Sequence, residues 1–316
     1  MRIANLMQPI LLMAGLLATI GAVLPARAAE EERLRPFILG NTPPGGMEQV
    51  VTAVKAALKA QGFEEAGSYS PYAGATVIVV TNPELRAAAA RVKLGGFGAG
   101  ERVAVTELHG KLQVSYLNPA YIGAAYGLGK LERVSEKLKE ALGAAKDFGS
   151  AHGLTAQELA PGTYRYMTGM PYFHQVDQLA KYDSYQNAVA AVERGLAAGN
   201  GGTKKVYRID LPGRETSVFG VAIVSGDGLD KGDKDTDKEI MDIIDWKDPR
   251  STAYLPYEIL VQGGEVLALR GRYRIAVHFP DTTMMGAHGF TKIMSAPGGI
   301  KNALKAVAAG EPAKVE

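Results

Sequence analysis

Residues 101–117, with the sequence ERVAVTELHGKLQVSYL, decide the fold that we predict for this chain. Two stretches rich in β-branched residues lie on either side of His109 and Gly110, a pair that suits a tight hairpin turn. The earlier run 75–81 (ATVIVVT) has the same composition and predicts a third strand. These strands indicate an antiparallel sheet in the first half of the chain.

Three segments around these strands have the spacing of amphipathic helices. In residues 47–61, apolar side chains recur every three or four positions, and Gly62 stands where a helix commonly ends. Asn82-Pro83 begins a short helix over 83–92, because proline is tolerated in the first turn. Residues 129–143 carry leucine and valine on one face.

The second half of the chain repeats this order of helix, strand, helix, hairpin and helix. We therefore predict an α+β protein of two related domains, each an antiparallel sheet with helices packed on one face. The domains are expected at 29–143 and 184–316, joined by a bridging segment at 144–183. The expected elements of the second half are helices at 184–198, 235–245 and 298–308, and strands at 217–224, 256–262, 265–270 and 272–279.

A resemblance to a known family rests on the first half. The helix that ends in a glycine, the strand before Asn82-Pro83, the hairpin of 101–117 and the break at Asn118-Pro119 resemble family 302 of the domains of unknown function. The second half, about 182–308, resembles it more loosely. The resemblance implies a small α+β domain and offers no activity. It suggests haem binding or dimeric ligand binding, which some members are thought to show.

The first residues of the chain indicate export. An apolar run at 10–24 follows a positive start at Arg2, and Ala26-Arg27-Ala28 has the form of a cleavage site. We therefore expect residues 1–28 to be a signal peptide and the protein to be periplasmic or secreted after cleavage near Ala28. No second stretch is long enough to span a membrane, so we expect no membrane span in the mature form.

Composition excludes several functions. Without the leader the chain has 33 basic and 33 acidic side chains, so no positive surface for nucleic acid is expected. The chain has no cysteine, which excludes disulfides, iron–sulfur clusters, thiolate zinc sites and covalently attached c-type haem. Glu107 and Glu258 fall on corresponding strands. They are either a functional pair across the two halves or two separate residues that face solvent.

Two clusters of methionine and histidine are the candidate binding residues. Thioether and imidazole groups without thiolates suit copper(I) or the axial positions of a non-covalent haem. Methionine also fills gaps against aromatic side chains, and histidine is often structural, so packing is the alternative interpretation. The candidate metal ligands are Met167, Met170, His174, His278, Met284, Met285 and His288. Of these, the candidate haem or cofactor ligands are Met170, His174, His278 and Met285.

These observations favour an exported ligand-binding or accessory protein that holds haem or copper near the seam between its halves. A ligand-free interaction module of the cell envelope is the alternative, with a small molecule or an envelope protein, or a second copy of the chain, as partner. A metal- or haem-dependent redox enzyme ranks lowest, because no activated nucleophile or acid–base pair can be assigned and no catalytic residue is predicted.

Overall fold

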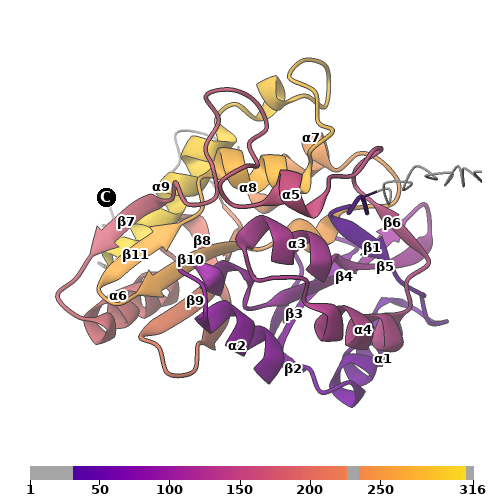
Figure 1. The fold of residues 1–316 in the computed structure, drawn as a ribbon, viewed down its shortest axis with the longest axis horizontal. Coiled ribbons are helices and arrows are strands. Elements are labelled where there is room, and N and C mark those ends of the chain that lie inside the picture. The colour runs from indigo at the N-terminus through magenta and orange to yellow at the C-terminus, as the bar shows by residue number, and fades with distance from the viewer. Residues whose placement is uncertain (1–30, 226–234, 311–316) are drawn as a thin grey trace, which may run out of the picture. The chain divides into compact units, whose positions relative to one another are not determined.

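Each half of the chain builds one antiparallel sheet in the computed structural model of the protein (Figure 1). The structure describes residues 31–225 and 235–310. Within them, the first sheet has six strands in the spatial order β2-β3-β4-β5-β1-β6. These strands are β1 (Phe37–Leu39), β2 (Glu64–Tyr69), β3 (Ala75–Thr81), β4 (Glu101–Leu108), β5 (Lys111–Leu117) and β6 (Lys146–Phe148).

The second sheet reproduces the arrangement of the first. Its five described strands have the order β7-β11-β10-β9-β8, so β7 lies beside β11 as β1 lies beside β5. Its strands are β7 (Asp177–Lys181), β8 (Thr203–Asp210), β9 (Thr216–Ile223), β10 (Tyr257–Gln262) and β11 (Glu265–Ala268). The predicted α+β class with two antiparallel sheets is confirmed.

The helices also occur at corresponding places in the two halves. In each half a helix precedes two strands, a second helix follows them, and two further helices follow the next hairpin. The first half has α1 (Met47–Ala60), α2 (Pro83–Ala90), α3 (Pro119–Tyr126) and α4 (Glu132–Leu142). The second half has α6 (Tyr185–Ala197), α7 (Asp237–Ile244), α8 (Gly271–His278) and α9 (Ala296–Ala309), and α5 (Ala156–Leu159) lies between the halves in sequence.

Helices cover the outer face of each sheet, and the inner faces meet. Val54 of α1 and Leu138 of α4 pack on Val103 of β4 in one apolar cluster. Because side chains alternate along a strand, Arg102 points to the opposite face, where it contacts β10 of the second half. Helices α6 and α9 lie against each other on the second sheet. The described residues from Glu32 onwards form one compact unit.

The structure differs from the predicted elements in two places. The strand predicted at 272–279 is wrong, because these residues form helix α8. Strands β6 and β7 both lie in the segment 144–183, which was expected to be only a bridge. No helix among the described residues is long and apolar enough to cross a membrane. The predicted signal peptide, 1–28, lies outside the described residues.

Candidate functional site

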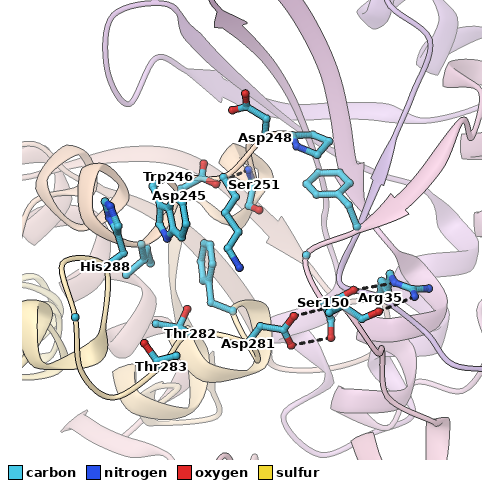
Figure 2. Close-up of a pocket in the computed structure, with 18 of the residues that line it drawn as sticks. Arg35, Ser150, Asp245, Trp246, Asp248, Ser251, Asp281, Thr282, Thr283 and His288 are labelled. Atoms are coloured by element: carbon cyan, nitrogen blue, oxygen red, sulfur yellow. Dashed lines mark hydrogen bonds between the residues drawn. The ribbon is translucent and has the colours of Figure 1, made fainter.

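A cleft of about 910 Å³ opens between the first and second halves of the chain (Figure 2). One wall is β6 with the loop that follows it, 146–151. The other wall consists of residues 244–251, after α7, and residues 279–288, after α8. Cavities of a few hundred to about 1,000 Å³ are the usual size of small-molecule sites.

Hydrogen bonds between the halves fix both walls. The side chain of Gln113 on β5 donates to the carbonyl of Arg250 (2.7 Å) and accepts from the Arg250 amide (2.9 Å). At the other end of the cleft, Ser150 donates its hydroxyl to Asp281 (3.0 Å), and the Ala151 amide donates to the same carboxylate. Arg35 donates to the carbonyls of Ser150 and Ala151. These hydrogen bonds therefore fix the positions of the two walls of the cleft relative to each other.

The only tryptophan of the chain lies in this cleft. Trp246 is 47% exposed, although it is large and apolar. The ring of His288 stacks on its indole, with ring centres 4.5 Å apart and planes 18° apart. The ammonium of Lys247 lies 5.3 Å from the indole centre, which is a cation–π distance. Figure 2 shows His288 beside Trp246 on the wall made by the second half.

The tautomer of His288 follows from its hydrogen bond. Its Nδ1 lies 2.8 Å from the carbonyl of Ile243, which can only accept. In the neutral ring, Nδ1 therefore carries the hydrogen and Nε2 has the lone pair. Metal-ligating histidines commonly have this arrangement, with one nitrogen fixed by a backbone carbonyl.

Asp245 is the buried acid of the cleft. Its side chain is almost inaccessible, with the residue 3% exposed. Oδ1 accepts from the amide of Ser251 (2.8 Å), whereas Oδ2 has no hydrogen-bond partner among the described residues. Burial raises the pKa of Asp245 to about 7, although the Ser251 amide and the Arg250 guanidinium act in the opposite direction. An unsatisfied buried oxygen is rare in native proteins and is a position where a ligand or water can bind.

The structure places the candidate methionine and histidine residues in three environments. Met285, which is 72% exposed, and His288 line the cleft, and Met284 precedes them in the same loop. Met167 and Met170 lie in a different turn, in which the Met170 amide donates a hydrogen bond to the carbonyl of Met167.

His174 follows that turn and is exposed. Its ring stacks on Tyr172 with centres 5.7 Å apart. The same segment packs between the halves through Phe173, which contacts Tyr126 of α3 and Tyr273 of α8. Across residues 31–225 and 235–310, no three histidine, aspartate or glutamate side chains are grouped so as to hold a metal ion.

His278 belongs to a buried charge network away from the cleft lining. Its Nδ1 donates to the carbonyl of Arg274 (2.9 Å), and its Nε2 lies 3.3 Å from Nη2 of Arg102. Burial and the two guanidinium groups hold the pKa of His278 well below its usual value, so the ring is neutral. Both ring nitrogens therefore already have partners within the protein.

Glu258 is the acidic centre of this network. Arg102 of β4 donates to one carboxylate oxygen, and Arg274 of α8 donates to the other (3.1 Å). Glu107, its hypothetical partner, is exposed at the far end of β4. The hypothesis of a Glu107–Glu258 pair is thus wrong: the residue that meets Glu258 between the two halves is Arg102.

Sequence reasoning singled out Glu258 and His278 of the network and Met285 and His288 of the cleft, but it missed Arg102, Arg274, Asp245 and Trp246. Glu258 is an isolated charge in an apolar strand, and such a charge is a signal for a buried ion pair. Asp245 is the last residue of the helix predicted at 235–245, and Trp246 follows it. No pattern of spacing marks them.

No family model, curated protein or solved structure matches this chain. The resemblance to family 302 of the domains of unknown function therefore stays a prediction, and the site is interpreted from its own residues.

Proposed function

We propose that this protein binds a small organic molecule in the cleft between its two halves. The observation that carries the proposal is Trp246, a half-exposed indole inside a cleft whose frame is held by hydrogen bonds from both halves. A large aromatic ring exposed to water has an unfavourable free energy of hydration. A molecule bound in the cleft would cover the ring and remove this cost. Polar groups from both walls would orient that molecule.

Binding is favoured over catalysis because the Ser150 hydroxyl and the Arg35 guanidinium already donate hydrogen bonds within the protein. The Ser150 hydroxyl donates to Asp281, and Arg35 is engaged by backbone carbonyls. A nucleophile would need an adjacent base to accept its proton, and the side chain next to Ser150 is a carboxylate already bonded to a backbone amide. A ligand-free interaction module of the envelope remains the alternative.

The single tryptophan makes the proposal testable. In a ¹⁵N-labelled sample, the Trp246 indole N–H gives one assigned signal from this cleft. Screening a panel of small organic fragments by ligand-observed NMR should give binders that shift this signal in a saturable way. The same binders should be lost in Trp246→Ala and kept in Tyr172→Ala, which removes a ring outside the cleft. Binders that leave the indole signal unchanged would contradict the proposal.

Copper(I) or non-covalent haem is a second candidate ligand. It is supported by the free Nε2 of His288 and by the exposed thioether of Met285 in the same cleft. Imidazole and thioether suit both groups. Anaerobic copper(I) titration against a chromogenic chelator, and haem titration by absorption, should show uptake that His288→Ala abolishes and His174→Ala preserves. Failure of the wild-type chain to take up either group would remove this candidate.

Export is part of the proposal and rests on residues 1–28 alone. We expect the protein to be recovered from the periplasm or medium with its N-terminus near Ala29. Fractionation followed by N-terminal sequencing tests this. A cytoplasmic protein that retains Met1 would contradict it.

A further inference from the structure

We propose that the molecule bound in the cleft carries a cationic nitrogen, and that this nitrogen donates a hydrogen bond to Oδ2 of Asp245 beside Trp246. The inference rests on the proposed function and adds the chemical class of the ligand. The reason is that Asp245 lines the cleft, is almost fully buried, and keeps one carboxylate oxygen without a partner. A buried carboxylate is stabilised most by a charged donor.

Of the other carboxylates that line the cleft, Asp147 is exposed to water, whereas Asp281 and Asp248 already lie beside donors. Asp281 accepts from the Ser150 hydroxyl and the Ala151 amide. Asp248 lies 3.7 Å from Nε of Arg250 and 3.5 Å from Nε2 of His109. Among the described carboxylates that line the cleft, Asp245 thus combines burial with an oxygen that has no donor.

The surroundings of Trp246 favour a cation too. Its indole is approached by the Lys247 ammonium at 5.3 Å, and Lys247 is exposed and free to rotate away. We interpret this ammonium as marking the position over the indole that a cation of the ligand would take. An aromatic face next to a carboxylate is a common way to recognise organic ammonium groups.

The cations of the cleft offer no buried donor for an anion, since Lys146 and Lys247 are exposed. Arg35 directs its guanidinium to the carbonyls of Ser150 and Ala151. An anionic ligand next to Trp246 would meet the carboxylates of Asp245 and Asp248. Like charges in a partly buried site cost free energy, so an anion is disfavoured.

The pH dependence of binding follows from the surroundings of Asp245. Burial raises its pKa to about 7, with Asp248 raising it further and the Arg250 guanidinium and Ser251 lowering it. Tyr72 of the first half also faces this carboxyl. A bound cation stabilises the ionised carboxylate, so affinity for an amine should rise between pH 6 and pH 8 and then level off.

Three five-carbon probes of matched length test the inference: 1,5-diaminopentane, 1,5-pentanediol and glutarate. The readout is the Trp246 indole signal during titration of the full chain at pH 8. We expect the diamine to bind at least about tenfold more tightly than the diol or glutarate, a difference of about 1.4 kcal/mol. Asp245→Asn should abolish this preference. Asp242→Asn, a matched change of an exposed acid that does not line the cleft, should keep it.

The possible results distinguish failure of the cationic ligand from failure of the binding function. Equal or tighter binding of the diol or glutarate, or an unchanged preference in a folded Asp245→Asn variant, would overturn the cationic ligand and leave the binding function standing. If no fragment or probe shifts the indole signal, the binding function itself fails. Lys247→Ala gives a second check if Asp245→Asn does not fold. Removing the internal ammonium should tighten diamine binding severalfold, and weaker binding would contradict the inference.

Discussion

At the scale of single residues, Glu258 carries much of the contact between the two halves. Its carboxylate is the only acidic partner that the described residues give to the buried guanidinium groups of Arg102 and Arg274. Buried charges are tolerated only when they are paired, and removal of one partner leaves the others uncompensated. Two buried guanidinium groups therefore depend on one carboxylate.

We predict that Glu258→Gln lowers the free energy of unfolding by about 3–5 kcal/mol, because both guanidinium groups lose their counter-charge. Urea denaturation followed by circular dichroism measures this. Glu107→Gln is the matched control, since Glu107 is exposed, and it should change stability by less than about 0.5 kcal/mol. If Glu258→Gln lowered the free energy of unfolding no more than Glu107→Gln does, the network would contribute little to stability.

Asp237, at the start of α7, provides a second residue-scale prediction. The acid is buried, accepts from the Tyr69 hydroxyl (2.8 Å) and the Ile223 amide (3.2 Å), and burial raises its pKa to about 7. Between about pH 4 and pH 7 the folded carboxyl holds a proton that the unfolded chain releases, given an unfolded pKa of about 3.9. Stability is therefore greatest at the acidic end of this range and falls as pH rises through 7.

We expect the free energy of unfolding to fall by on the order of 1–3 kcal/mol from pH 5 to pH 8 through this group. Asp237→Asn should reduce that slope. Asp242→Asn, which changes an exposed acid on the same helix, should preserve it. Chemical denaturation across this pH range measures the slopes, and equal slopes in both variants would exclude the role of Asp237.

At the scale of elements, the two sheets correspond strand by strand. Strands β2 and β8 each contain a bulge, just before Gly67 and Tyr207 respectively. Following the register from these positions across β3 and β9 leads to Arg102 on β4 and Glu258 on β10. The two residues that pair between the halves therefore occupy equivalent places in their sheets, as expected near a pseudo-twofold axis.

Gly67 shows how closely these edge strands approach. A β-carbon added at Gly67 would lie 2.1 Å from the carbonyl oxygen of Val206 on β8, and this backbone atom cannot move aside alone. We predict that Gly67→Ala lowers the free energy of unfolding by about 1–3 kcal/mol. Gly298→Ala, in α9 with open space around it, should be neutral or slightly stabilising. Thermal or urea denaturation compares the two, and equal effects would contradict the close contact.

The sequence indicates most elements with strong periodicity. The predicted strands at 75–81, 101–108 and 111–117 coincide with β3, β4 and β5, because they are short apolar runs bounded by turn residues. Residues 272–279 were predicted as a strand because all residues of α8 except Arg272 are buried. The helix therefore lacks a polar face, and its sequence resembles that of a buried strand. Strand β2 was missed because its side chains are mostly small or charged.

At the scale of the whole molecule, the cleft arises only from tertiary structure. Its walls come from three segments that are far apart in the sequence, and periodicity does not reveal which loops meet. The prediction that His288 and Met285 matter was made from side-chain chemistry, and the structure places both in the cleft. The position of Asp245, by contrast, depends on the end of α7 and on Gln113 of the other half.

The inner face of each sheet is buried by the other half. We therefore predict that each half needs the other in order to fold. We expect fragments 29–149 and 175–316 to remain largely unfolded when expressed separately, because each would expose apolar surface and half of the Arg102–Glu258 network. Circular dichroism and amide hydrogen exchange on the fragments, alone and mixed, test this. Two fragments that each fold stably alone would show independent domains.

A crystal structure of the chain grown with 1,5-diaminopentane tests the binding cleft most directly. We predict density for the diamine between Trp246 and the loop 146–151, with one nitrogen at hydrogen-bond distance from Asp245 and Lys247 displaced from the indole. An ordered diamine bound elsewhere on the molecule, with the cleft unchanged, would contradict the assignment of this cleft as the ligand site.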